Sequence, residues 1–209
     1  LQFRPIFLRH SSFAPGTLLY FIAPPYPNLS GLMFVRYGAN VTTEGTDSGH
    51  VVRLQDHNAA IVFYRDDQNN WHEQTVDKNW NAHTVPTLPT AFAGSILLEV
   101  VELASGQVKR GDAVVLILYW RPVAKVDKDY TVFVHLVDAN GQMVAGTDSP
   151  LKQGDAPTSH WRINELVPEG VVVPINAGVP PGDYRIEIGL YEPATMQRLS
   201  ILDTRGQPI

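Results

Sequence analysis

The segment PTSHWRINE, residues 157–165, places an aromatic ring between two side chains that can donate hydrogen bonds. Trp161 stands there between His160 and Arg162, in a polar stretch and outside any apolar run. Proteins bind sugars by stacking the C–H face of the sugar on an aromatic ring beside polar hydrogen-bonding groups. The sequence therefore predicts a ligand-binding set that comprises Trp161, His160, Arg162, Tyr191, Trp120 and Asp148.

Both tryptophans of this set also have a purely structural interpretation. Tryptophan in a β-sandwich usually packs in the core, and this is the favoured interpretation of Trp120, whereas for Trp161 core packing and ligand contact stay open. His135, in the middle of the apolar segment DYTVFVHLVD, raises a similar question. We interpret it as a packed histidine that is bonded to a neighbour, in preference to a metal ligand or a catalytic base.

No motif of an established chemistry is present in the sequence. It lacks the G-x-S-x-G nucleophile turn, the phosphate-binding G-x-x-x-x-G-K-[ST] loop, the H-E-x-x-H zinc helix and G-x-G-x-x-G. The densest polar cluster, DSGHVVRLQDH at residues 47–57, lacks a recognised ligand spacing and is interpreted as a polar loop. We therefore predict no catalytic residue, no metal site and no cofactor.

Composition excludes further classes of protein. The 209 residues are 44% hydrophobic and 18% charged, with a net charge of −5, which is typical of a globular chain. Before Gly94 the chain has 6 basic and 7 acidic residues, and from Gly94 on it has 10 and 14, so neither part is basic and neither favours nucleic acid or an anionic membrane surface as a partner. The absence of cysteine excludes disulfides and thiol nucleophiles. The longest apolar run, AVVLILYW at 113–120, is too short to span a bilayer, so no membrane-spanning segment is predicted in this chain.

Residues 1–91 predict a small α/β unit that ends in a linker. Apolar runs at 17–23 and 59–66 have the length of buried strands. Helices are predicted at 28–38, where Asn28 can cap and Gly38 can end the helix, and at 66–80, where Trp71, Val76 and Trp80 share a side. The alternation of strands and helices indicates parallel strands. A proline-rich linker or crossing strand follows at 84–95.

Residues 92–209 predict an antiparallel β-sandwich, Ig-like or jelly-roll-like, so that the whole chain is of the α+β class. Alternating apolar and polar residues recur in short segments separated by turns such as DANG at 138–141, in which glycine can take positive φ. In DYRIEIGLYE the residues Tyr184, Ile186, Ile188 and Leu190 are expected to face inward. The predicted strands are 95–104, 113–121, 130–138, 142–149, 170–175, 183–192 and 197–203.

Several blocks of this second unit resemble a known family. VKRGDAVVLILYWRP, DYTVFVHLVDANGQMVAGTDSPL, PTSHW and PPGDYRIEIGLYEPATMQRLSI together resemble the β-sandwich domain at the C-terminus of bacterial multi-pass membrane proteins. Those proteins are similar to glycosyltransferase family 39, the protein-mannosyltransferase type. Before Gly94, TLLYFIAPPYP and AAIVFYRDD are similar to the small α/β segment that follows the last membrane helix of such enzymes.

The resemblance implies a non-catalytic extracytoplasmic region of a membrane glycosyltransferase-like protein. Its chemistry would reside near the membrane helices of the parent protein, so no catalytic residue is carried over. The chain, which begins with Leu1, is then expected to be a piece of a longer protein on the outer face of the cytoplasmic membrane. Its partners would be a glycan or its own membrane domain. The alternatives are a binding or adhesion module with no sugar function and a hydrolase whose site has no legible motif.

Overall fold

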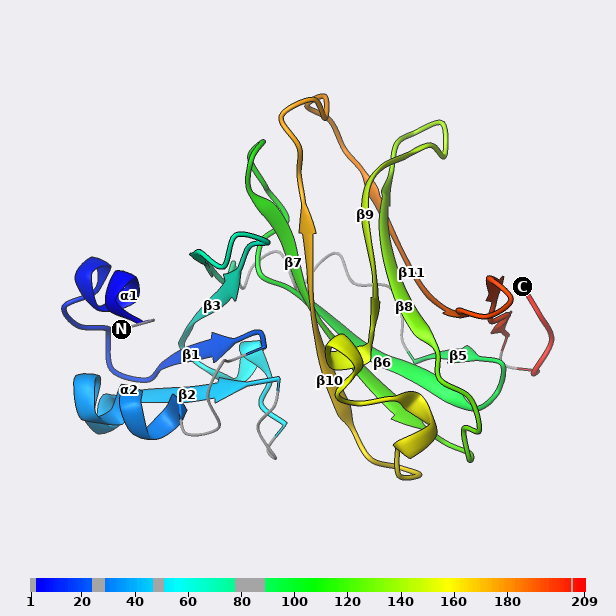
Figure 1. Ribbon diagram of the computed structural model, residues 1–209, viewed down its shortest axis with the longest axis horizontal. Coiled ribbons are helices and arrows are strands. Elements are labelled where there is room, and N and C mark those ends of the chain that lie inside the picture. The colour runs from blue at the N-terminus through cyan, green and yellow to red at the C-terminus, as the bar shows by residue number, and fades with distance from the viewer. Residues whose placement is uncertain (1–2, 24–28, 47–50, 78–88, 204) are drawn as a thin grey trace.

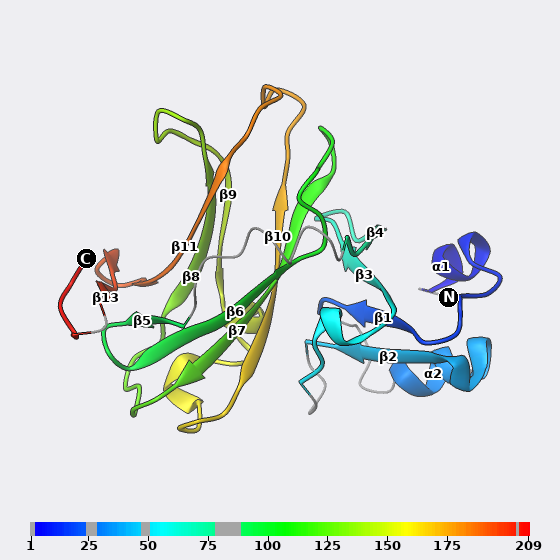
Figure 2. The same ribbon diagram turned by 180° about the vertical axis from the view of Figure 1, so that it is seen from behind.

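The computed structural model describes residues 3–23, 29–46, 51–77, 89–203 and 205–209. Its layers follow one another across the molecule: two helices, a mixed four-stranded sheet, and two antiparallel sheets that pack together (Figure 1). Figure 2 shows the same succession from behind. The predicted fold class, a small α/β unit followed by an antiparallel sandwich, is therefore confirmed. The boundary between residues 91 and 92 stays a prediction.

The N-terminal sheet, which we call sheet A, has the strand order β2-β1-β3-β4. β1 pairs in parallel with both β2 and β3, and α2 lies on the connection from β1 to β2, as a parallel pair requires. The two strands and the first helix predicted here are confirmed, whereas α1 and β2 lie outside the predicted elements. The elements are α1 (Arg4–Arg9), β1 (Thr17–Phe21), α2 (Leu29–Tyr37), η1 (Gly38–Asn40), β2 (Val41–Gly45), η2 (Leu54–Asp56), β3 (Ala59–Arg65) and β4 (Trp71–Thr75).

The helix predicted over residues 66–80 is wrong, because β4 occupies Trp71–Thr75 and pairs antiparallel with β3. A side-chain turn causes the difference. Oδ1 of Asp66 accepts hydrogen bonds from the backbone N–H groups two and four residues later, at 3.0 and 2.8 Å, and Asn69 takes a φ of 69°. These contacts reverse the chain into a hairpin. Trp80, which the helical pattern also used, lies outside the described residues.

Both helices cover one face of sheet A (Figure 1). Leu29 and Met33 are four residues apart in α2, so they share the helix face that is turned to the sheet. No helix in the described parts of the chain is long and apolar enough to cross a membrane. The core beneath the helices consists of Phe3, Ile6, Leu19, Phe21, Leu29, Met33, Phe63 and Trp71.

The sandwich consists of sheet B, with the order β10-β7-β6-β5-β13, and sheet C, with the order β12-β11-β8-β9. Every pairing in these two sheets is antiparallel. The predicted strand segments are all found, and the last one divides into two short strands in different sheets. The bounds are β5 (Thr90–Phe92), β6 (Ile96–Leu103), β7 (Ala113–Pro122), β8 (Thr131–Val137), β9 (Met143–Pro150), η3 (Leu151–Gly154), η4 (Thr158–His160), β10 (Val167–Pro174), β11 (Arg185–Glu192), β12 (Gln197–Arg198) and β13 (Ile201–Leu202).

Alternate side chains of the facing strands fill the space between sheets B and C. Leu190 is fully buried there, whereas Tyr184, Ile186 and Ile188 are partly buried and pack against the same cluster. The inward orientation predicted for β11 is therefore confirmed, with burial that increases along the strand. The buried residues include Phe92, Ile96, Leu98, Leu116, Leu118, Trp120, Val132, Val134, Leu136, Val171, Val173 and Leu190.

The other face of sheet B is covered by sheet A. This arrangement explains the unbroken apolar run of β7: every residue from Ala113 to Trp120 is buried, because the strand has a packed layer on both sides. The cluster between sheets A and B includes Leu18, Tyr20, Ile22, Ala60, Val62, Tyr64, Ala104, Val115, Ile117 and Tyr119.

Candidate binding cleft

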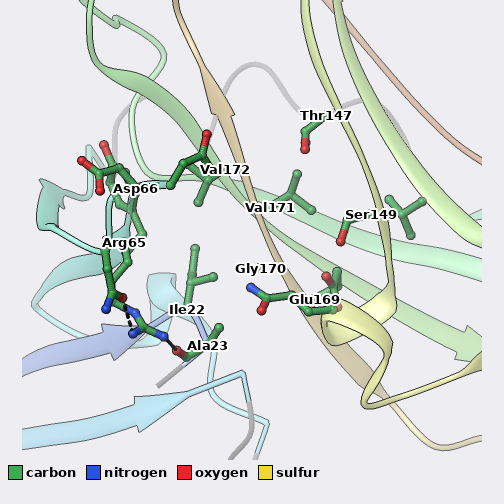
Figure 3. Close-up of a pocket in the computed structure, with 15 residues that line it drawn as sticks. Ile22, Ala23, Arg65, Asp66, Thr147, Ser149, Glu169, Gly170, Val171 and Val172 are labelled. Carbon is green, nitrogen blue, oxygen red and sulfur yellow. Dashed lines mark hydrogen bonds between the residues drawn. The ribbon is translucent and has the colours of Figure 1, made fainter. Parts of the chain in front are cut away.

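A cleft opens where the edge of the sandwich faces the β3–β4 turn of sheet A (Figure 3). Its volume of about 320 Å³ lies at the lower end of the range of ligand pockets. β9 and β10 are edge strands of sheets C and B, so the cleft lies at an open side of the sandwich. The polar residues that line it are Arg65, Asp66, Asp67, Asn69, Thr147, Ser149, Gln153 and Glu169.

One wall of the cleft carries a buried carboxylate. Glu169 lies on the same face of β10 as Val167 and Val171, which belong to the sandwich core, and it is only 5% exposed. Its Oε2 accepts a hydrogen bond from the backbone N–H of Lys152 at 2.7 Å. This bond from a backbone N–H fixes the orientation of the carboxylate. Glu169 is therefore held in place before any ligand arrives.

The turn that contacts Glu169 is strained. Lys152 and Gln153 take φ values of 46° and 56°, in the left-handed region that residues other than glycine seldom adopt. Gln153 lines the cleft. Across the opening, Thr147 and Ser149 extend from β9 toward β10 (Figure 3). Strained backbone beside a cavity is often part of a binding site, and here the strained Gln153 lines the same cleft as Thr147 and Ser149.

The opposite wall is formed by the β3–β4 turn. Nη1 of Arg65 donates to Oδ1 of Asn69 at 2.6 Å, and its Nη2 donates to the carbonyl of Ala23 at 3.4 Å. Oδ2 of Asp66 lies 2.9 Å from Nε2 of His72. This bond, together with those from Asn70, holds the pKa of Asp66 below its usual range. In Figure 3, β10 runs between this wall and the one with Thr147 and Ser149.

The inner end of the cleft depends on a glycine. A Cβ atom on Gly170 would lie 2.7 Å from Cγ1 of Ile22 and 3.0 Å from Cγ2 of Thr46. Only a residue without a side chain therefore lets β10 approach sheet A so closely. Ile22, Val171 and the glycine backbone form an apolar surface between the two polar walls.

A buried polar network fixes the position of sheet A on sheet B. Glu102 of β6 is fully buried. Its carboxylate accepts hydrogen bonds from the backbone N–H of Leu54 at 3.0 Å, from Nε of Arg53 at 3.1 Å and from Oη of Tyr119 at 2.8 Å. Burial, together with the negative charge of Glu102, raises the pKa of Tyr119. Because these bonds are directional, they define the orientation of the two units that form the cleft.

The structure separates the residues that the sequence assigned to ligand binding. Trp120 is fully buried between sheets B and C, so it has no ring face to offer, and its assignment to the site is corrected to a core role. Trp161 is partly buried, and its Nε1 donates to the carbonyl of Ala156 at 3.1 Å. His160 and Arg162 beside it are exposed. None of these residues lines the cleft, and for Trp161, His160 and Arg162 ligand binding stays a prediction.

The remaining two predicted residues meet on the outer face of sheet C. Oδ1 of Asp148 lies 2.8 Å from Nε2 of His135, so the interpretation of this histidine as packed and bonded to a neighbour is confirmed. Burial, followed by the charge of Asp148, raises the pKa of Tyr191. Phe133 lies between His135 and Tyr191, with the Arg198 guanidinium 4.3 Å from its ring centroid. A ligand role for Tyr191 and Asp148 stays a prediction.

Sequence reasoning missed the residues of the cleft itself. Asp66 and Asn69 were not predicted as site residues because the apolar spacing of their segment indicated a helix. Asp and Asn so close together also indicate a turn. Glu169 had a clearer signal, a carboxylate inside the apolar segment VPEGVVVPI. Of the polar cluster at 47–57, Asp47 and His50 lie outside the described residues. Within the described ranges no group of three or more His, Asp or Glu is placed to hold a metal ion.

No protein-family model matches the chain, and no curated protein sequence matches it either. Solved structures with distant similarity include a β-glucuronidase from glycoside hydrolase family 2, with 12% identity and a TM-score of 0.34 over 49% of this chain. Another is a calcium-binding mutant of Bacteroides uniformis β-glucuronidase 2, with 12% identity and a TM-score of 0.32 over 52% of this chain. The matched part spans only 11% and 13% of those two chains.

Proposed function

We propose that this chain is a non-catalytic extracytoplasmic region of a membrane glycosyltransferase-like protein, and that it binds a glycan in the cleft between β9, β10 and the β3–β4 turn. The resemblance of the sandwich sequence blocks supports the parent protein and its location. The membrane domain of the same parent protein would be its physical partner. The polar and apolar groups around the cleft support the binding role.

The observation that carries the proposal is the arrangement of groups around the cleft. A sugar ring presents hydroxyls that both donate and accept hydrogen bonds, and C–H groups that are apolar. The cleft offers acceptors at Glu169, donors at Arg65, and hydroxyls at Thr147 and Ser149, around the apolar surface of Ile22 and Val171. A few fixed polar groups around an apolar surface are typical of small-molecule sites. The pattern therefore fits a polyhydroxylated ligand.

The experiment is a titration of the 209-residue chain with cell-wall and exopolysaccharide fragments, followed by NMR shifts. We expect a Kd near 1 mM, which corresponds to about −4 kcal/mol. Glu169→Gln keeps an acceptor for the Lys152 N–H but removes the charge, and should weaken binding about tenfold, as expected for one charged hydrogen bond. Ser149→Ala should weaken it less. Glu187→Gln, on the exposed face of β11, is the matched control and should have no effect.

Two outcomes contradict the proposal in different ways. If Trp161→Ala abolishes binding and Glu169→Gln does not, the glycan lies on the loop of residues 160–162, and the cleft assignment is wrong. If no fragment produces a saturable shift up to its solubility limit, the sugar function itself fails. The alternative of a binding module for another class of ligand would then be favoured.

A further inference from the structure

The helical layer exposes apolar side chains on the side that faces away from the sandwich. In α2, Leu29 and Met33 are buried against sheet A, so the other apolar residues of this short helix point to solvent. Phe34 is 59% exposed and Val35 is 85% exposed. In α1, Leu8 is 73% exposed. Large apolar side chains that gather on one exposed surface mark an interaction site more often than scattered ones do.

These residues lie on α1 and α2, and we call the outward sides of these two helices the helical face. The rings of Phe7 and Tyr37 join the two helices with their centroids 6.0 Å apart. The guanidinium of Arg36 lies 5.9 Å from the Phe7 ring and 5.0 Å from the Tyr37 ring. Oη of Tyr37 also donates to the carbonyl of His10 at 3.0 Å. These contacts hold α1 and α2 side by side.

The charge of this region has the opposite sign to that of the rest of the chain. Residues 1–43 contain three arginines and no Asp or Glu, a charge of +3, and the whole chain carries −5, so the remainder carries −8. Arg9 forms an ion pair with Glu73 at 3.1 Å, whereas Arg4 and Arg36 are exposed. The net charge of the chain, which argued against an anionic membrane surface, conceals this local asymmetry.

We infer that the helical face binds the surface of an anionic lipid bilayer. Short helices with exposed Phe, Leu and Val beside arginines insert their apolar residues at the headgroup boundary, while the guanidinium groups stay at the lipid phosphates. The acidic remainder of the chain would be repelled by the same surface, which gives the molecule one orientation. A second copy of the chain is disfavoured as the occupant, because a symmetric contact would bring arginines of like charge together.

This inference is independent of glycan binding. The helices lie on one face of sheet A, and sheet B together with the cleft lies on the side of the other face (Figure 1). A chain that is bound to a bilayer through the helical face would therefore keep the cleft open. Failure of the glycan titration would leave the membrane contact untouched, and the reverse also holds.

The test is co-sedimentation of the 209-residue chain with vesicles of equal parts phosphatidylglycerol and phosphatidylcholine, and with vesicles of phosphatidylcholine alone. We expect binding to the anionic vesicles that disappears near 1 M salt, where the Debye length is about 3 Å. The double variant Arg4→Gln, Arg36→Gln should weaken it about 25-fold, at about fivefold for each arginine near the surface. Leu8→Ser with Val35→Ser should weaken it about tenfold or more, because both side chains lose apolar contact with lipid.

Matched variants separate this contact from general charge and hydrophobicity. Lys109→Gln with Arg110→Gln removes the same charge from an exposed turn of the sandwich, and Met196→Ser removes an exposed apolar side chain far from the helices. Both should bind vesicles like the parent chain. Equal loss in the control and helical-face variants would overturn the inference, and so would no sedimentation with anionic vesicles. Concentration-dependent self-association that the Leu8 and Val35 changes abolish, with no vesicle binding, would instead assign the face to a second copy.

Discussion

The two faces of sheet B pack against different layers by different means. Toward sheet C, β7 presents Val114, Leu116, Leu118 and Trp120 to an apolar core. Within the described residues the Nε1 of Trp120 has no hydrogen-bond partner, so around this tryptophan the interface relies on packing. Apolar burial is non-directional and proportional to the area removed from water. It holds the sandwich together without specifying fine orientation.

Toward sheet A the same strand presents Val115, Ile117 and Tyr119, and here a buried polar network accompanies the apolar contact. Glu102 connects Tyr119 to the segment around Leu54. A buried polar network stabilises only one relative orientation of the two sheets, because any shift leaves a carboxylate or an N–H group without a hydrogen-bond partner. The sandwich core therefore provides cohesion, whereas the contact between sheets A and B provides the orientation on which the cleft depends.

The largest loss of stability is expected on replacing Glu102, which forms the polar network between sheets A and B. Glu102→Ala removes the buried acceptor of four groups and should lower the free energy of unfolding by about 3–5 kcal/mol, measured by urea denaturation. Glu99 lies on the same strand and forms a partly exposed ion pair with Arg121, so Glu99→Ala is the matched control and should cost less than about 1 kcal/mol. Equal losses in the two variants would mean that the network does not orient the sheets.

A smaller effect is expected at the close approach of β10 to sheet A. Gly170→Ala places a methyl group against Ile22 and Thr46 and should cost about 1–3 kcal/mol through overpacking. Gly178→Ala is the control, since nothing lies within 4 Å of its Cβ position. Thermal unfolding of both variants checks the contrast.

A double variant tests the contact between Gly170 and Ile22 more directly. Ile22→Ala removes the two nearest atoms that an alanine at position 170 would meet and leaves the contact with Thr46. The loss in the double variant should therefore be smaller than the sum of the two single losses, because the variants share one contact. If the two losses of stability were strictly additive, Gly170 of β10 and Ile22 would not be in close contact in solution.

The smallest effect concerns the turn that forms one wall of the cleft. Hydrogen bonds hold the pKa of Asp66 below its usual range, and the ordinary value is about 3.9. The stability that this carboxylate contributes is therefore present above that ordinary pKa and is lost as the pH falls through the folded value. We expect the protection factor of the Asn70 amide, which corrects for the intrinsic exchange rate at each pH, to fall as the solution is acidified, and Asp66→Asn should remove that pH dependence. An Asp66 carboxyl that titrates at or above its ordinary value, measured by carbon NMR, would contradict this.

Three aspartate turns show which turns could be predicted from the local sequence. Asp66, Asp138 and Asp203 each accept hydrogen bonds from the N–H groups two and four residues later, at 2.8 to 3.0 Å. The residue three positions later has positive φ in each turn: Asn69, Gly141 and Gly206. Where glycine marks that position the turn could be predicted, as for DANG. Asn69 is a weaker indication of positive φ than glycine, so the helical spacing of the residues around it led to the prediction of a helix.

The sequence alone predicted most strands of the sandwich and the inward side of β11, because the alternation of side chains along a strand has a period of two whatever lies above the sheet. It also indicated the packed state of His135. Only the tertiary structure decided which layer covers each face of β7, where the cleft opens and that Trp120 is core. The cleft joins Arg65 and Asp66 to Thr147, Ser149 and Glu169. Residues so far apart in the chain meet only because sheet A docks on sheet B, and that docking depends on long-range packing, on Glu102 and on the missing side chain of Gly170.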